Sequence, residues 1–376
     1  MPLEVVERAV ARVDLDAVRR NCARLRSLVP AGGKLCAVVK ADGYGHGALP
    51  CARAALRGGA EWLAVAAAGE AADLRAQGLE GRILVMGALT TEEIGVAVEA
   101  RADVVAWSER FVAELEPFAA SAAQPVGVHV KLDTGMGRLG TKDPSEARAV
   151  VDAVAQSERL ELTGVLTHFA TADERGDDHF PAQLAAFERF VADVKASHPG
   201  VIAHAANSAA TLREPAAHFD MVRCGVAIYG LDPFGGDPAD SQLEPALSLE
   251  SYVAEVKRFE PGDSAGYGRR WRAERPTWVG VLPIGYGDGV RRALTNNAEV
   301  LVGGRRYPLV GTVSMDNVTI DLGPETDVRP RQPAVLIGRQ GDETILCEEV
   351  AERLQTINYE VTCGLLPRVR RDHRGG

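Results

Sequence analysis

Residues 34–47 have the sequence KLCAVVKADGYGHG, an apolar run that ends in a lysine and continues into a glycine-rich loop. Seven further apolar runs follow, and stretches with the spacing of amphipathic helices separate several of them. Alternating strands and helices favour a parallel sheet, and eight strands over roughly 230 residues favour closure into a (β/α)8 barrel. An open, doubly wound sheet fits the same pattern, because periodicity does not reveal closure. The expected strands are 34–41, 62–67, 82–87, 103–108, 127–133, 162–170, 201–207 and 221–230.

A stretch rich in glycine, proline and aspartate, residues 231–238, marks the expected boundary between two domains. We assign residues 1–238 to the barrel and 239–376 to a C-terminal, mainly β domain, so the predicted class is α/β. The basic tail, residues 368–376, is expected to fray at its end. Helices are expected at 68–77, 91–100, 144–157, 181–196 and 344–354, with Thr90 and Asp143 as N-caps of the second and third.

The chain has 376 residues, and a content of 46% hydrophobic and 25% charged residues is typical of a globular protein. No apolar run approaches the roughly 20 residues of a membrane-spanning helix, so we expect no membrane partner. The net charge of −10 disfavours nucleic-acid binding, which usually requires a basic surface. The six cysteines form no CxxC pair, which predicts reduced thiols and no metal site. The N-terminus, Met1-Pro2-Leu3-Glu4, has no signal-peptide pattern, which predicts a cytoplasmic protein.

Catalytic groups of a (β/α)8 barrel lie at the C-terminal ends of its strands. A lysine there is costly to bury unless it is paired or used covalently, and burial favours the neutral, nucleophilic amine. Lys40 is therefore a candidate for Schiff-base formation, although a rim lysine that extends its amine to solvent gives the same pattern. The full set of strand-end candidates is Lys40, Lys131, Arg138, His168, Asn207, Ser208, Arg223 and Gly225.

The segments after the seventh and eighth strands often bind phosphate in barrels, and Ser208 and Gly225 lie in these segments. A phosphate site beside an aldehyde-reactive lysine indicates pyridoxal 5′-phosphate (PLP) as the cofactor. Ser208 also fits the N-cap of a helix, a role compatible with holding a phosphate.

The string AVVKADGYGHG, residues 37–47, resembles the PLP-lysine signature of alanine racemases. The resemblance continues through both expected domains, and the chain departs from the family pattern at Gly43 and Ser314. It implies a PLP barrel followed by a β domain and a homodimer with shared active sites. It also implies an isomerase that interconverts L-alanine and D-alanine and supplies D-alanine for peptidoglycan synthesis.

The resemblance also assigns residues to the cofactor. Lys40 forms the Schiff base with PLP, and Arg223 faces the pyridine nitrogen. Because arginine stays protonated, it cannot readily donate a full proton to that nitrogen, and negative charge then stays nearer the substrate Cα. The other cofactor-binding residues implied are Tyr44, His168, Asn207, Ser208, Gly225 and Tyr359.

For the substrate, the resemblance implies that Arg138 and the backbone at Met315 bind the carboxylate of alanine. Tyr267 of the partner subunit is the second catalytic base, opposite Lys40, and His168 orients it. Lys131 matches a position that is often carbamylated in the family and that steadies Arg138.

Three other functions fit part of the same sequence pattern. A decarboxylase built on the same two domains has an acidic residue against the pyridine nitrogen, which Arg223 disfavours. A non-catalytic PLP carrier resembles the barrel alone, and the second domain and Tyr267 disfavour it. A racemase of broad specificity differs only in the size of its pocket, which the sequence does not give.

Overall fold

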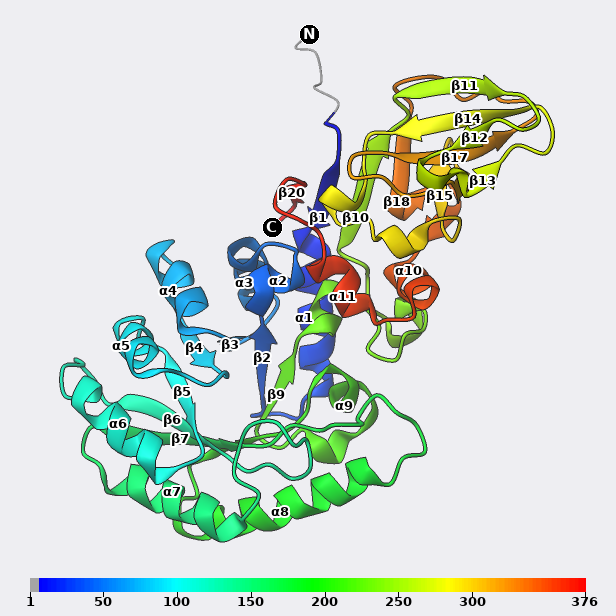
Figure 1. Ribbon diagram of the computed structural model, residues 1–376. Coiled ribbons are helices and arrows are strands. Elements are labelled where there is room, and N and C mark those ends of the chain that lie inside the picture. The colour runs from blue at the N-terminus through cyan, green and yellow to red at the C-terminus, as the bar shows by residue number, and fades with distance from the viewer. Residues whose placement is uncertain (1–6) are drawn as a thin grey trace. The chain divides into compact units, whose positions relative to one another are not determined.

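Eight short parallel strands close into a barrel in the computed structural model, which describes residues 7–376. Strand β9 pairs with β8 on one side and β2 on the other, so this sheet has no free edge. Strands β2 and β9 lie side by side in Figure 1. Each strand overlaps one of the eight expected ranges, which confirms the barrel and excludes an open sheet. The strands are β2 (Lys34–Val38), β3 (Trp62–Val65), β4 (Arg82–Val85), β5 (Asp103–Ala106), β6 (Val126–Lys131), β7 (Leu160–Leu166), β8 (Ile202–His204) and β9 (Met221–Cys224).

Helices follow the barrel strands along the chain, and α4 to α8 lie around the strands in Figure 1. Both predicted caps are confirmed: the Thr90 hydroxyl accepts a hydrogen bond from the Glu93 amide at 3.3 Å, and Asp143 accepts one from the Ser145 amide at 2.8 Å. The helices are α1 (Leu15–Leu28), α3 (Ala48–Arg57), α4 (Ala68–Ala76), α5 (Thr91–Glu99), α6 (Glu109–Ala119), α7 (Pro144–Gln156), α8 (His179–Ser197) and α9 (Ser208–Arg213).

The barrel interior contains polar side chains among apolar ones. Every residue of β3 and of β6 is buried, as expected for parallel strands covered on both faces. Strand β6 nevertheless carries His129 and Lys131, and β9 carries Arg223. Buried polar groups require hydrogen-bond partners, so these positions lead to the candidate site.

The contacts divide the chain into two units. We call them the barrel unit (Val18–Ile228) and the β unit, which joins the described residues up to Ala17 to Tyr229–Gly376. The predicted β domain is confirmed by a sheet with the neighbour order β11-β14-β17-β16-β15-β18-β10-β1-β20, with β19 paired to β18. Its strands are β1 (Val10–Asp14), β10 (Leu247–Tyr252), β11 (Glu255–Phe259), β14 (Thr277–Leu282), β15 (Glu299–Val302), β16 (Arg305–Val310), β17 (Val318–Gly323), β18 (Pro333–Gln340), β19 (Glu343–Ile345) and β20 (Arg370–Arg374). Two helices, α10 (Cys347–Leu354) and α11 (Asn358–Cys363), complete the unit.

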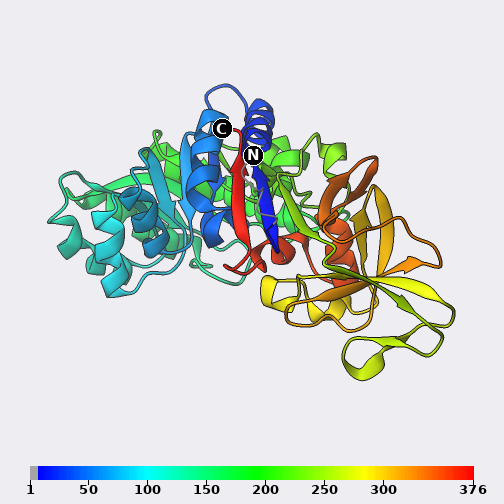
Figure 2. The ribbon, with the colours of Figure 1, turned by 90° about the horizontal axis from the view of Figure 1, so that it is seen from above.

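Most of the basic tail forms a strand, and only Gly375 and Gly376 lie beyond it, so fraying at the end of the tail stays a prediction. This strand, β20, lies parallel to β1 (Figure 2). Arg12 on β1 forms ion pairs with Glu250 on β10 at 2.8 Å and with Asp372 on β20 at 2.6 Å. Asp372 gives the tail an acidic residue that pairs with Arg12 on β1, and this contact helps to hold β20 at the edge of the sheet.

Two further expectations concern the domain boundary and the N-terminal residues. The contact division falls between Ile228 and Tyr229 and places the first strand in the β unit, and the domain boundary at 238 stays a prediction. Met1-Pro2-Leu3-Glu4, on which the signal-peptide prediction depends, lies outside the described residues. Within residues 7–376, no helix has the length and apolarity needed to cross a bilayer.

Candidate active site

Lys40 begins an unusual turn, α2 (Lys40–Tyr44), directly after barrel strand β2. Residues 41–44 all have positive φ, between 52° and 61°. Residues with a Cβ pay roughly 1–2 kcal/mol each for this left-handed conformation, so the surroundings must fix it. Glu70 on α4 does so, because its Oε1 accepts a hydrogen bond from the Ala41 amide at 2.6 Å and its Oε2 accepts one from the Ala66 amide at 2.8 Å. The turn therefore holds Lys40 at the C-terminal end of the barrel.

Four cationic side chains of the barrel unit act electrostatically on His168, which follows β7. The pKa of His168 is held well below its usual value, chiefly by desolvation. The positive charges of Arg223, Arg138, Lys131 and Lys40 lower it further. Lys131, only 5% exposed at the end of β6, is perturbed by the same cluster. Its burial, followed by repulsion from Arg223 and Arg138, lowers the pKa of Lys131 to about 8. The cluster therefore favours neutral bases and attracts anions.

Arg223 on β9 is the most deeply buried of these cations, at 4% exposure. Its terminal nitrogens donate to the carbonyls of Thr167 at 2.8 Å, His204 at 2.8 Å and Ala205 at 3.0 Å, and to Nδ1 of His168 at 3.3 Å. Burial lowers the pKa of Arg223 to about 10, so it remains a cation at neutral pH. No described residue pairs a carboxylate with it or accepts a hydrogen bond from its Nε. Nε can therefore donate to a bound group, and the pyridine nitrogen of PLP is an acceptor of that kind.

Three residues from different elements lie close together. They are Tyr44 at the end of the α2 turn, Ser208 at the start of α9 and Gly225 directly after β9. A Cβ built on Gly225 would lie 2.3 Å from the Tyr44 hydroxyl oxygen, so a glycine is needed here. The Ser208 hydroxyl accepts hydrogen bonds from the amides of Gly225 at 3.1 Å and Ala227 at 3.3 Å. Hydroxyls and clustered backbone amides are groups that bind phosphate, so this cradle fits the phosphate of PLP.

Asn207, rather than Ser208, caps α9, which corrects the alternative considered for Ser208. The Asn207 side chain accepts a hydrogen bond from the Ala210 amide at 3.0 Å. Its carbonyl accepts one from the Thr211 hydroxyl at 2.7 Å. The start of α9 is thus fixed without the Ser208 side chain, which contacts the Gly225 amide instead.

Asp133 shapes the loop before Arg138, a role the sequence analysis missed. Its carboxylate accepts hydrogen bonds from the amides of Gly135 at 3.0 Å, Met136 at 2.7 Å and Gly137 at 2.8 Å. An aspartate followed by glycines two and four residues later is a turn signal that could have revealed this loop. Arg138 is exposed and forms no ion pair with a described residue.

Gln183 on α8 fixes the backbone around His168, and the sequence analysis missed it too. The side chain is fully buried. Its Nε2 donates to the His168 carbonyl at 3.2 Å, and its Oε1 accepts a hydrogen bond from the Ala170 amide at 2.8 Å. The only sign of this role in the sequence is that Gln183 occupies an apolar position of an amphipathic helix.

Tyr267, Met315 and Tyr359 belong to the β unit, and their relation to the barrel cluster stays a prediction. Tyr267 is 74% exposed, and its carbonyl accepts a hydrogen bond from the Thr312 hydroxyl at 2.6 Å. Met315 is 52% exposed, and its amide donates to no described residue. Tyr359 lies on α11 and is half-buried.

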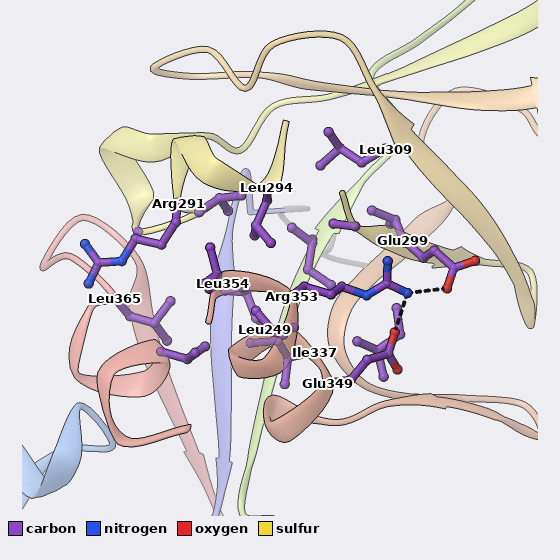
Figure 3. Close-up of a pocket in the computed structure, with 18 residues that line it drawn as sticks. Leu249, Arg291, Leu294, Glu299, Leu309, Ile337, Glu349, Arg353, Leu354 and Leu365 are labelled. Atoms are coloured by element: carbon purple, nitrogen blue, oxygen red, sulfur yellow. Dashed lines mark hydrogen bonds and ion pairs between the residues drawn. The ribbon is translucent and has the colours of Figure 1, made fainter. Parts of the chain in front are cut away.

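A cavity beneath α10 in the β unit is too small to be the cofactor site (Figure 3). Its volume of about 40 Å³ is far below the roughly 300–1,000 Å³ typical of ligand pockets. Aliphatic side chains line most of it, and Arg353 closes one side through ion pairs with Glu299 at 2.9 Å and Glu349 at 3.0 Å. We interpret it as a packing gap of the core.

Comparison with known proteins places both units in one family. The alanine racemase N-terminal domain matches residues 13–233, and the alanine racemase C-terminal domain matches residues 246–373. The alanine racemase of Symbiobacterium thermophilum is 40% identical over 100% of this chain and 99% of its own length. The enzyme of Geobacillus stearothermophilus is 42% identical over 96% of this chain and 92% of its own length.

Solved structures agree with the sequence comparison. The alanine racemase of the D-cycloserine producer Streptomyces lavendulae has a TM-score of 0.93 and 38% identity, over 99% of this chain and 98% of that chain. The alanine racemase of Bacillus anthracis with bound L-Ala-P has a TM-score of 0.88 and 38% identity, over 98% of this chain and 95% of that chain. The chain therefore belongs to the alanine racemase family of PLP-dependent isomerases.

Proposed function

We propose that this protein interconverts L-alanine and D-alanine with two proton-transferring side chains, Lys40 and Tyr267. The observation that carries the proposal is the barrel cluster in which Arg223, a buried cation without a carboxylate partner, lies beside His168. Bound PLP supplies an electron sink for the negative charge at Cα. A fixed guanidinium at the pyridine nitrogen leaves more of that charge at Cα, where a proton can be returned.

The phosphate of PLP would be held by the cradle and its neighbours. The Tyr44 and Ser208 hydroxyls would supply donors in the barrel unit, and Tyr359 is the proposed donor from the β unit. Gly225 would lie against the phosphate, with its amide holding the Ser208 oxygen in place. Asn207 supports the cradle by fixing the start of α9. Lys40 would carry the cofactor covalently, and the left-handed turn after it fixes the direction of its backbone.

The carboxylate of alanine would be bound by Arg138 and by the backbone amide of Met315. Lys131 is the proposed carbamylation site beside Arg138. Its lowered pKa, about 8, leaves a larger neutral fraction than an ordinary lysine has at neutral pH, and only the neutral amine attacks carbon dioxide. The resulting carboxylate would give Arg138 the anionic partner that no described residue provides.

Proton transfer on the two faces of the substrate is assigned to Lys40 and to Tyr267 of the partner subunit. Both act on the same Cα, one removing a proton and the other returning one to the opposite face. His168 accepts from Arg223 through Nδ1, so its proton lies on Nε2, from which it can donate to the tyrosine oxygen. His168 is thus the proposed link between Arg223 and Tyr267.

A homodimer with shared sites is supported by the distribution of exposed apolar side chains. Five of the six large hydrophobic residues exposed among residues 7–376 lie in the β unit. Large apolar side chains left exposed in one unit are groups that a second subunit can cover. They are Tyr267, Tyr286, Met315, Ile357 and Leu366. We further propose that the D-alanine feeds peptidoglycan synthesis, and the cytoplasmic location stays a prediction.

Incubation of the purified protein with L-alanine in heavy water tests this function. We expect loss of the Cα proton signal in proton NMR together with formation of D-alanine in chiral chromatography. Carbon dioxide release without D-alanine would instead identify a decarboxylase. Bound PLP with no turnover would identify a carrier, and rapid turnover of larger amino acids would identify a broad-specificity racemase.

A further inference from the structure

A chain of hydrogen bonds runs through the barrel behind Arg223. Nη1 of Arg223 lies 2.9 Å from Nδ1 of His204, and Nε2 of His204 lies 2.8 Å from Nδ1 of His129. Nε2 of His129 lies 3.3 Å from Oδ2 of Asp103. Both imidazoles are fully buried. The chain connects four different strands, β9, β8, β6 and β5.

The direction of every hydrogen bond in this chain is determined by its two ends. Arginine only donates, so Nδ1 of His204 must accept, and the proton of the neutral ring lies on Nε2. Nδ1 of His129 then accepts, and its Nε2 donates to Asp103, which as a carboxylate only accepts. Desolvation, followed by the charges of Arg223 and His129, holds the pKa of His204 well below its usual value, which favours the neutral ring.

Two glycines provide the space that this chain occupies. A Cβ on Gly164 would lie 2.3 Å from Nδ1 of His129, and a Cβ on Gly127 would lie 2.4 Å from Oδ2 of Asp103. The register of β6 against β7 also shifts between Val128 and His129, and such a shift re-aims a side chain. The backbone is therefore built around the His129–Asp103 contact.

The far end of the chain lies at the N-terminal face of the barrel. Asp103 is the first residue of β5 and borders a cavity of about 510 Å³. Arg82 lies 3.6 Å from Asp103 and 3.7 Å from Glu161, which lines the same cavity. Asp103 thus reaches the solvent side of the barrel, on the face opposite the strand ends that carry the candidate site.

We propose that Asp103, His129 and His204 form a positioning relay that holds both imidazoles in the Nε2-protonated form and so fixes an acceptor behind Arg223. The relay compensates a buried guanidinium without placing a carboxylate beside the cofactor, where it would compete for Nε. A direct carboxylate partner would also weaken the positive charge that faces the pyridine nitrogen. This part of the inference rests on the proposed function, whereas the relay itself rests on the hydrogen bonds.

The test uses the PLP-loaded enzyme with 15N-labelled histidine, and NMR reports which ring nitrogen carries the proton. We expect His129 and His204 each to show a single Nε2-protonated form. Asp103→Asn should add a second form at His129, because an asparagine can present a donor as well as an acceptor to its Nε2, whereas Arg223 keeps Nδ1 of His204 an acceptor. Glu161→Gln is the matched control at the same cavity and should leave both signals unchanged.

A second pair of variants keeps the test decisive if Asp103→Asn does not fold. His129→Gln retains an acceptor and a donor and should keep His204 in its Nε2-protonated form. His129→Leu leaves the buried Nε2 proton of His204 without an acceptor, so the ring should turn away from Arg223 and lose its single form. By analogy with partners that orient metal-bound histidines, His129→Leu should lower kcat about tenfold and change KM for alanine less than about twofold. It should also shift the absorption of bound PLP.

Unchanged tautomers and PLP absorption in Asp103→Asn or His129→Leu would overturn the relay, as would an equal effect of Glu161→Gln. The proposed function fails separately. If the protein has no racemase activity but its histidine signals follow the expected pattern, the relay stands and the proposed function is wrong. If it racemises alanine but the histidine signals do not follow the pattern, the function stands and the relay is wrong.

Discussion

The Tyr44 hydroxyl lies against Gly225, at a point where a Cβ on residue 225 would come within 2.3 Å of its oxygen. Gly225→Ala should therefore displace Tyr44 from the cradle. Loss of one hydrogen bond to a charged phosphate costs about 1.5–3 kcal/mol, so PLP should bind about 10- to 100-fold more weakly. Titration of the cofactor-free protein with PLP measures this, with Gly200→Ala as control because a Cβ there meets nothing within 4 Å. Wild-type affinity in Gly225→Ala would contradict the assignment.

Lys131 should react with carbon dioxide more readily as the pH rises from 7 to 9. With a pKa of about 8, roughly a tenth of the amine is neutral at pH 7 and most of it at pH 9. The amine attacks carbon dioxide, an N–C bond forms, and a proton is released. In 13C-bicarbonate, NMR should show a carbamate signal that grows over this range and is absent in Lys131→Met. A signal that survives this substitution would place the reaction at another amine.

Arg223→Glu should shift the balance between racemisation and side transamination. A carboxylic acid can protonate the pyridine nitrogen, which draws charge away from Cα and lets the proton return elsewhere. The ratio of pyridoxamine phosphate to D-alanine should therefore rise. Because three carbonyls would lose their donor, the folded state of the variant must be verified by circular dichroism, with Arg223→Gln as a neutral comparison. An unchanged ratio in a folded variant would refute the role of Arg223.

Gly164→Ala should destabilise the barrel, since its Cβ would meet His129 at 2.3 Å and the Ile202 carbonyl oxygen at 2.9 Å. Overpacking of this kind costs roughly 1–3 kcal/mol in the free energy of unfolding. Gly69→Ala, at an exposed position of α4 where a Cβ meets nothing, should instead raise stability by up to about 1 kcal/mol. Urea unfolding measures both, and equal stability of the two variants would argue against tight packing at Gly164.

Local periodicity in the sequence predicted alternating strands and helices, because the strands are continuous apolar runs separated by amphipathic stretches. The number of strands, eight, favoured closure into a barrel. The sequence did not predict the pairing of β1 with β20, because Arg12 and Asp372 are 360 residues apart and only the fold brings them together. Lys40 and Arg223 could be identified from the sequence because each lies at the end of an apolar run. The hydrogen-bond partners of His129 could not be identified, because they lie on other strands. A histidine inside the apolar run Val126–Lys131 signals a buried hydrogen bond without identifying what accepts it.

A complementation experiment between two inactive variants tests the central claim most directly. Lys40→Ala and Tyr267→Phe should each be inactive, because each lacks one proton-transferring group. After unfolding and refolding as an equal mixture, half of the dimers should be mixed, and each mixed dimer should contain one site with both groups intact. We predict recovery of roughly a quarter of wild-type racemase activity, as expected for statistical assembly of a two-fold dimer with shared sites. Mixed dimers without activity would contradict a site that combines Lys40 of one subunit with Tyr267 of the partner subunit.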